Sequence, residues 1–160
     1  MSVSPEITIE PGDRDDPQVR ALYEAFIRES DGPLGIDLEA EFAGGPPQEL
    51  MPPNGILLVA RIGSEAIGLG GVRHLDTEVA EVKSMFVSKS RRGLGVGHRL
   101  LVELERIAAS RGCRAVRLDT SDYLAPAIGL YRSAGYLEVP PYDENPKANL
   151  WFERTLRRDA

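Results

Sequence analysis

The sequence predicts a mixed α/β protein, and three observations lead to that fold class. Three apolar, β-branched runs, Ile56–Ile62, Ala66–His74 and Val79–Val87, are separated by short turns, as in an antiparallel meander. Apolar residues then recur at helical spacing over Val96–Ala108, which predicts a long amphipathic helix that Gly112 ends. Another strand pattern, Ala115–Asp119, follows that helix, so strands and helices are mixed along the chain.

One strand and one helix are predicted before the meander. Ile7 and Ile9 alternate with polar neighbours, which is typical of a strand. Asp16 is a favoured helix cap and Pro17 suits the first helical position, so a helix begins there. Its apolar face consists of Val19, Leu22, Tyr23, Phe26 and Ile27. A short second helix is predicted over Asp37–Phe42.

The stretch Gly44–Gly55 is dense in glycine and proline, which excludes regular structure and predicts a loop that covers part of a functional site. At the other end of the chain, the pattern over Pro126–Ala134 predicts a helix closed by Gly135. Alternation over Leu150–Leu156 predicts the last strand.

Length and composition indicate one soluble domain over residues 1–160. The chain is 42% apolar and 28% charged, a mixture that can bury a core without disulfides. Its formal charge of −6 argues against nucleic acid as a partner, because phosphate binding on that scale needs a broad cationic face. The basic cluster of Lys89, Arg91 and Arg92 is large enough for one phosphorylated cofactor only.

The cellular compartment is read from the single cysteine and from the apolar runs. Cys113 has no possible intramolecular partner, which favours a reducing cytoplasm. Met1–Glu10 lacks the pattern of a signal peptide, and no apolar run approaches the roughly 20 residues that a membrane helix needs. A cytoplasmic protein without a membrane partner is therefore expected.

The strongest functional signal is the junction where Val82–Val87 runs through a basic, glycine-rich turn into the long helix. The first amides of a helix have no internal acceptor and lie at the positive end of its dipole, so a diphosphate can accept hydrogen bonds from them. Gly93, Gly95 and Gly97 allow close approach of such an anion. The pattern predicts a phosphate-binding turn.

Two other phosphate motifs fit less well. A dinucleotide fingerprint starting at Gly93 needs glycine at its sixth position, where this chain has His98. A nucleotide P-loop needs Gly-Lys-Ser or Gly-Lys-Thr, which does not follow the glycines.

The segment Arg92–Gly97 resembles the Arg/Gln-x-x-Gly-x-Gly/Ala acetyl-CoA signature of the GNAT superfamily of N-acetyltransferases. Glu81–Val87 is similar to the strand that precedes this signature, and Ala127–Tyr136 is similar to the family's Leu-Tyr-x-x-x-Gly-Phe/Tyr helix end. The resemblance covers about residues 56–156. It implies a central, mostly antiparallel sheet flanked by helices, and acetyl-CoA as the cosubstrate.

The resemblance also implies where acetyl-CoA binds. The amides of the glycine-rich turn hold the pyrophosphate, and the preceding strand pairs with the pantetheine arm as an added strand would. The residues concerned are Met85, Phe86 and Val87 on the strand, and Arg92, Gly93, Leu94, Gly95, Val96, Gly97 and His98 in the turn and helix.

Acetyl transfer to an amine requires a proton acceptor, because an alkylammonium group with a pKa near 10.4 is almost entirely protonated at pH 7. Glu81, which resembles the acidic residue that many family members carry on this strand, is the first candidate, acting through water. Asp119, Glu78, Asp122 and a chain of waters remain alternatives.

The leaving thiolate requires a proton donor, and Tyr131 occupies the position of the family's general-acid tyrosine. One departure concerns Leu124, which stands where many relatives carry asparagine, so that polar contact cannot be transferred to this chain. Cys113 lacks any cue for activation and is expected to be buried. His74 and His98 lack the spacing of metal ligands, so no metal is expected.

The acceptor is expected to be an amine of a small molecule or peptide. The first helices, the Gly44–Gly55 loop and the Pro140–Pro146 loop would shape its site, and a homodimer is compatible with the sequence. Two other functions stay open. A CoA-sensing module of the same fold would bind CoA without turnover, and a dinucleotide-dependent oxidoreductase would respond to NAD(P)H.

Overall fold

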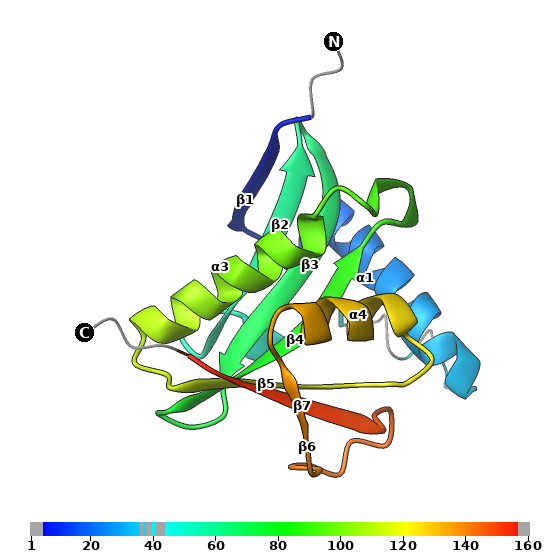
Figure 1. Cartoon of the computed structure of the whole chain (residues 1–160). Coiled ribbons are helices and arrows are strands. Elements are labelled where there is room, and N and C mark those ends of the chain that lie inside the picture. Colours follow the sequence, from blue (N-terminus) through cyan, green and yellow to red (C-terminus); the bar gives the residue numbers. More distant parts are fainter. Residues whose placement is uncertain (1–4, 36, 38–39, 41–43, 157–160) are drawn as a thin grey trace.

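The computed structural model describes residues 5–35, 37, 40 and 44–156, which form one seven-stranded sheet of order β1-β2-β3-β4-β5-β7-β6 (Figure 1). Only β4 and β5 are parallel, and the other neighbouring strands are antiparallel. The strands are β1 (Ile7–Pro11), β2 (Gly55–Ile62), β3 (Glu65–His74), β4 (Val79–Val87), β5 (Ala115–Thr120), β6 (Leu137–Val139) and β7 (Leu150–Thr155). The predicted mixed α/β class and the antiparallel meander are confirmed.

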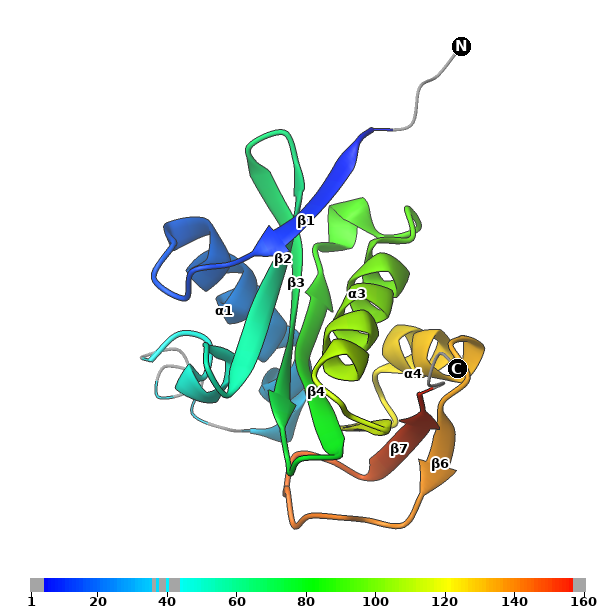
Figure 2. The ribbon, with the colours of Figure 1, turned by 90° about the vertical axis from the view of Figure 1, so that its left-hand side faces the viewer.

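Within the described residues, three α-helices flank the sheet: α1 (Pro17–Asp31) on one face, and α3 (Val96–Ser110) and α4 (Ala125–Ser133) on the other (Figure 2). Short 3-10 helices are η1 (Gly32–Leu34), η2 (Gln48–Leu50) and η3 (Lys89–Arg91). Each face has its own apolar cluster, because side chains alternate between the two faces along every strand. Leu100 and Leu104 of α3 are fully buried on one face, and Val19 of α1 on the other. None of the helices in residues 5–156 that the structure describes is long and apolar enough to cross a membrane.

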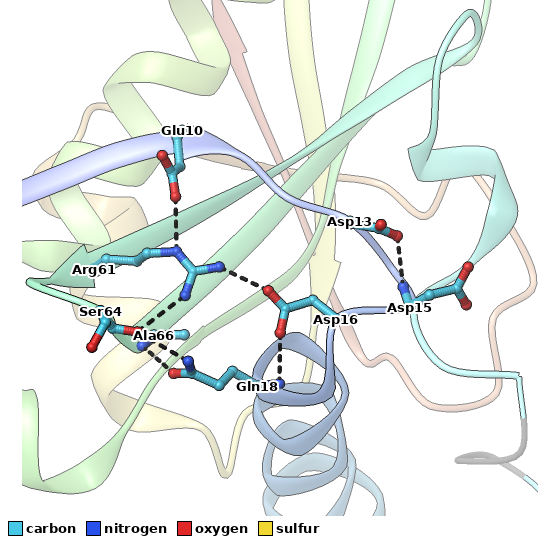
Figure 3. Close-up of polar contacts among 8 residues, drawn as sticks. All are labelled: Glu10, Asp13, Asp15, Asp16, Gln18, Arg61, Ser64 and Ala66. Carbon is cyan, nitrogen blue, oxygen red and sulfur yellow. Dashed lines mark hydrogen bonds and ion pairs between the residues drawn. The ribbon is translucent and has the colours of Figure 1, made fainter.

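The N-terminus of α1 is fastened to the β2–β3 hairpin by side chains (Figure 3). Asp16 caps the helix as predicted, because its Oδ1 accepts a hydrogen bond from the Gln18 amide at 2.9 Å. Its other oxygen pairs with Arg61 at 3.0 Å, and Arg61 also pairs with Glu10 at 2.8 Å. The Gln18 side chain accepts from the Ala66 amide at 2.7 Å. These contacts fix the direction in which α1 crosses the sheet.

Two expectations about the connecting segments need correction. Gly44–Gly55 contains the 3-10 helix η2, and its Leu50 is fully buried under α1, so the segment adds to the core. None of its residues borders the cavity beside the glycine-rich turn, which is described below. The second correction is strand β6, which the sequence analysis missed because three residues with exposed Leu137 carry almost no apolar pattern. The predicted helix Asp37–Phe42 falls largely outside the described residues.

A buried polar group joins α3 to the C-terminal part of the sheet. Glu105 is 6% exposed, accepts a hydrogen bond from the Tyr136 hydroxyl at 2.8 Å and pairs with Arg154 at 2.7 Å. Removing the carboxylate leaves both partners without their acceptor, which is costly for buried polar groups. The Glu105 carboxylate therefore links α3 to Tyr136 after α4 and to Arg154 on β7.

We expect Glu105→Ala to lower the free energy of unfolding by about 2 kcal/mol, measured by urea denaturation. Glu103→Ala on the same helix is the matched control, because Glu103 pairs with Arg106 on the surface. It should change stability by less than about 0.5 kcal/mol. Equal losses in the two variants would contradict a specific role for the buried carboxylate.

Candidate active site

The sheet forks between β4 and β5. The two strands pair only at their beginnings, from Val79 opposite Ala115 to Glu81 opposite Arg117. Beyond that point β4 turns away, because a bulge in its pairing with β3 places an extra residue near Ser84, whose φ is 59°. Among the residues that the structure describes, no strand therefore pairs with the edge of β4 that faces the fork, along Met85, Phe86 and Val87. A chain of amide groups can pair with such an edge.

The glycine-rich turn opens beside this free edge. Gly93 and Gly95 have φ values of 87° and 78°, and a side chain at either position would meet no other atom within 4 Å. The first backbone amide of this region with an acceptor in the helix is Arg99, which donates to the Gly95 carbonyl at 3.1 Å. Within the described residues, the amides of 93–98 have no recorded backbone acceptor. Free amides at a helix N-terminus can donate hydrogen bonds to an anion, which is the chemistry that the sequence predicts for this turn.

A cavity of about 280 Å³ joins the glycine-rich turn to the fork. Its lining includes Met85, Phe86, Val87, Arg92, Gly93, Gly95, Val96, Gly97, His98 and Tyr131, all predicted from the sequence, together with Phe26, Glu29, Ser30, Arg91, Leu124, Pro126, Ala127 and Leu130. Leu94 is 43% exposed and does not line the cavity. The cavity thus brings together residues of α1, β4, the glycine-rich turn, α3 and α4.

Tyr131 on α4 is 5% exposed and borders this cavity. Its ring packs against Tyr136 and Phe152 with centroid separations of 6.0 and 6.3 Å. Burial, followed by the nearby charge of Asp119, raises its pKa, so the hydroxyl keeps its proton across the ordinary pH range. No hydrogen bond of this hydroxyl is recorded within the described chain, which leaves its proton available to a ligand. At the start of α4, Leu124 provides no side-chain cap, as its apolar character predicted.

The last turn of α1 borders the cavity through Glu29 and Ser30. Glu29 forms a two-point ion pair with Arg92 at 2.6 and 3.0 Å. The Ser30 carbonyl accepts a hydrogen bond from Tyr123, and Asp31, 4% exposed, pairs with Lys147 at 2.8 Å. Arg92 also donates to the Val87 carbonyl at 3.0 Å and stacks on Phe86. Sequence analysis did not single out Glu29, because its partner lies 63 residues away.

Glu81 lies at the base of the fork, 1% exposed, with partners on both oxygens. Its Oε1 accepts from Arg73 at 2.9 Å and lies 3.5 Å from Lys83, and its Oε2 accepts from the Tyr142 hydroxyl at 2.6 Å. Arg73 pairs in turn with Glu49 at 3.2 Å. Neither Glu81 nor Asp119 lines the cavity, so both carboxylates lie behind its wall at the base of the fork.

Asp119 and Asp143 complete a group of three carboxylates with Glu81, each with an oxygen within 4.8 Å of the others. Asp119 accepts from Asn145 at 3.2 Å, while its Oδ2 is shielded from solvent without a hydrogen-bond partner in the described structure. Burial raises the pKa of Asp119 to about 6; the Lys83 charge opposes this shift and the Asp143 carboxyl adds to it. Three carboxylates at this spacing can also hold a cation. The sequence analysis considered the spacing of the histidines alone and did not find this group.

The remaining candidates of the sequence analysis lie elsewhere. Glu78 pairs with Arg114 at the far end of the sheet, where β4 begins. Cys113 is 3% exposed and burial raises the pKa of its thiol, which agrees with the expected burial. Tyr142 and Asp143 belong to the predicted Pro140–Pro146 loop, but their contact with Glu81 and Asp119 could not be read from the chain.

A forked sheet whose free strand edge leads into a glycine-rich helix N-terminus defines a protein of the acyl-CoA-dependent acyltransferase class. The model of the "Acetyltransferase (GNAT) family" matches residues 16–136 of this chain. The chain therefore belongs to the GNAT acetyltransferase family and is an acetyl-CoA-dependent acyltransferase, as the sequence predicted.

Relatives and folds agree with this assignment. An N-acetyltransferase of Schizosaccharomyces pombe whose activity is uncharacterised is 32% identical over 146 residues, covering 90% of this chain and 88% of its own. The IAA acetyltransferase of Azospirillum brasilense is 38% identical over 114 residues, covering 68% of this chain and 73% of its own. The crystal structure of a GNAT acetyltransferase from Staphylococcus aureus Mu50 superposes with a TM-score of 0.77 at 21% identity, covering 95% and 100% of the two chains. That structure shares the fold.

Proposed function

We propose that this enzyme transfers the acetyl group of acetyl-CoA to an amine of a small molecule or peptide by direct attack, in the cytoplasm. The observation that carries the proposal is one continuous cavity, which joins the unpaired amides of the glycine-rich turn to the Tyr131 hydroxyl. An anion site at one end and a proton donor at the other suit a long, phosphorylated thioester. The N-acetyltransferase names of the relatives support the same reaction.

The pyrophosphate of acetyl-CoA accepts hydrogen bonds from the amides of residues 93–98, including that of Leu94, whose side chain does not line the cavity. The pantetheine arm pairs with the free edge of β4 along Met85, Phe86 and Val87, at the place where β5 has diverged. This pairing directs the thioester toward Tyr131 on the opposite wall.

The reaction needs one proton removed and one supplied. The neutral amine attacks the thioester carbonyl, a C–N bond forms, and the C–S bond breaks. The amine proton passes to a carboxylate at the fork, for which Glu81 and Asp119 are the candidates. Tyr131 gives its proton to the leaving thiolate, which then departs as CoA. Each group regains its resting state by exchange with solvent.

The acceptor is defined here only by its reactive amine. The name of the Azospirillum relative points to small molecules, and that of a streptothricin acetyltransferase from Escherichia coli, 31% identical over 102 residues, does the same. The carboxylates at the fork favour an acceptor that arrives as a cation.

The direct test combines calorimetry with thiol release. The purified protein should bind CoA and acetyl-CoA, and it should release CoA when acetyl-CoA is mixed with a panel of primary amines. Binding without release for any amine would leave a CoA-binding module and refute the enzyme proposal. Binding of NAD(P)H in place of CoA would refute both.

We expect Glu29→Gln to bind CoA roughly 3- to 10-fold more tightly at low salt than the wild-type enzyme. The carboxylate of Glu29 lines the cavity and neutralises Arg92, so its removal both frees a cation and relieves repulsion of the pyrophosphate. The gain should shrink as salt rises, because ions screen such interactions. Isothermal titration calorimetry measures both effects.

Glu24→Gln on the same helix serves as the control, since Glu24 pairs with Arg28 on the surface. It should leave CoA affinity unchanged. Weaker CoA binding by Glu29→Gln would instead show that Glu29 serves to orient Arg92.

A further inference from the structure

We propose that the side chain of Arg91 binds a phosphate group of CoA, and that the side chain of Arg92, the arginine of the acetyl-CoA signature, holds the glycine-rich turn in shape. The inference rests on the proposed binding of acetyl-CoA and names a residue that the signature does not include. It is carried by the different partners of two adjacent guanidinium groups, both of which border the cavity.

The donors of Arg92 are occupied by the protein itself. Its Nε donates to the Val87 carbonyl at 3.0 Å, and its two Nη atoms form the two-point ion pair with Glu29 at 3.0 and 2.6 Å. Its guanidinium group also lies over the Phe86 ring, 5.5 Å from the ring centroid. Two-point pairs of arginine and carboxylate are among the stronger ion pairs. Arg92 therefore connects the turn to β4 and to α1, and its charge is already balanced.

Arg91 has a weaker attachment. Its Nη2 atom pairs with Glu65 at the start of β3 at 2.8 Å, and the side chain of Glu65 is 55% exposed. Exposed ion pairs of this kind contribute little to stability, because water and salt screen them. A ligand anion can therefore replace Glu65 at a small cost in free energy, whereas displacing Glu29 from Arg92 costs more.

The pair with Glu65 also leaves Arg91 incompletely satisfied. The Nε atom of Arg91 is shielded from solvent and has no hydrogen-bond partner among the described residues. A shielded N–H group without an acceptor is unfavourable. A phosphate presents several oxygens and can accept from two N–H groups of one guanidinium. Exchanging Glu65 for phosphate therefore gives Nε the acceptor that it lacks.

The location of Arg91 places this cation beside the free amides. Arg91 ends η3, where its amide donates to the Ser88 carbonyl at 2.9 Å, and the free amides begin two residues later at Gly93. Arg91 and Gly93 border the same cavity, whereas Glu65 does not border it. A phosphate in the cavity thus meets backbone donors and one guanidinium group together.

The charges on the cavity wall favour the same assignment. Glu29 and Arg92 cancel each other there, and the chain as a whole carries a formal charge of −6. An anionic ligand therefore needs a local cation whose own partner is easily displaced. Arg91 meets this requirement. CoA offers it either the pyrophosphate or the 3′-phosphate, which present the same kind of oxygen.

The first test is isothermal titration calorimetry with CoA at low salt. Arg91→Gln should weaken binding by about 10-fold, and the loss should shrink as salt rises. Lys89→Gln is the matched control, because Lys89 lies in the same 3-10 helix and carries the same charge but does not border the cavity. It should change CoA affinity by less than about 2-fold.

Two double variants compare the arginines at equal net charge, since each removes one cation and its carboxylate partner. Arg91→Gln/Glu65→Gln should still lose about 10-fold in CoA affinity. Arg92→Gln/Glu29→Gln should lose less than about 3-fold, and its Tm should fall further, because it removes the contact between the turn and α1. The reverse order of CoA affinities would assign the phosphate to Arg92.

Glu65→Gln alone should bind CoA more tightly, by roughly 2- to 5-fold at low salt. The change frees Arg91 from its only ion pair in the described chain. A gain in affinity cannot come from a damaged fold, so this variant separates ligand binding from structure. Weaker binding of CoA by Glu65→Gln would contradict the proposed exchange of partners.

Dephospho-CoA, which lacks the 3′-phosphate, shows which phosphate Arg91 contacts. If Arg91→Gln loses the same affinity for dephospho-CoA as for CoA, the contact is to the pyrophosphate. If the two proteins bind dephospho-CoA equally and differ only toward CoA, the contact is to the 3′-phosphate. Both results support the assignment of Arg91 as a phosphate ligand.

Equal CoA affinity of Arg91→Gln and the wild-type enzyme, or an equal loss in Lys89→Gln, overturns the inference while acetyl transfer stands. If the wild-type protein itself binds neither CoA nor acetyl-CoA, the proposed function fails and the inference falls with it.

Discussion

Replacing Tyr131 with phenylalanine should lower kcat for amine acetylation by about 10³-fold, within the range that a positioned proton donor contributes. The change removes one hydroxyl from a side chain that is 5% exposed and packed between two aromatic rings. Because the ring stays in place, the cavity keeps its shape. The thiolate then leaves without its proton, and acetyl transfer slows at that step.

Stopped-flow or steady-state detection of released thiol measures this effect, and calorimetry with CoA should give an unchanged Kd. A loss of CoA affinity equal to the loss of kcat would indicate a disturbed cavity. An unchanged kcat would show that solvent protonates the thiolate and would remove Tyr131 from the mechanism.

Tyr136→Phe is the matched control for this variant. Tyr136 packs against Tyr131 and is equally buried, but its hydroxyl donates to Glu105 inside the protein and does not reach the cavity. The variant should be less stable by about 1 kcal/mol with kcat close to that of the wild-type enzyme. Comparing kcat and stability of Tyr136→Phe and Tyr131→Phe separates the effect of losing a buried hydroxyl from the effect of losing the proton donor.

Gly95→Ala should weaken CoA binding by roughly 10- to 100-fold. Gly95 has a φ of 78° at the N-cap of α3, and its missing Cβ would point into open space beside the unpaired amides. A methyl group there keeps the pyrophosphate from those amides, and each lost hydrogen bond to a charged group costs about 1.5–3 kcal/mol. Calorimetry with CoA measures the change.

Gly112→Ala provides the control at the other end of the same helix. Gly112 has a φ of 90°, and a side chain there would also meet no atom within 4 Å. Both variants should lose about 1 kcal/mol of stability from backbone strain, but only Gly95→Ala should lose affinity. Equal CoA affinity in the two variants would show that the glycine-rich turn does not hold the pyrophosphate.

Most of the predicted site residues that line the cavity are close together in the chain. The turn from Arg92 to Gly97 joins a strand to a helix within a few residues, so its free amides and left-handed glycines follow from local geometry. The end of the preceding strand lies next to it for the same reason. Tyr131 was placed by the helix pattern and by the family resemblance, and it lies on the same cavity.

The carboxylates at the fork could not be assembled in this way. Glu81, Asp119 and Asp143 come from β4, β5 and the β6–β7 loop, and each alone reads as an ordinary acidic residue. The β-bulge near Ser84, which turns β4 away and opens the fork, leaves no recognisable pattern in the sequence. The pair of Glu29 and Arg92 depends on where α1 crosses the sheet.

The sequence by itself determined the mixed α/β class, most strands and helices, the glycine-rich turn and the family, because these depend on hydrophobic period, glycine placement and neighbouring residues. The tertiary structure alone brought Glu81, Asp119 and Asp143 together at the fork and gave each its neighbours. Burial and distance set the charge state of an acidic group, and both arise only when segments far apart in the chain pack together.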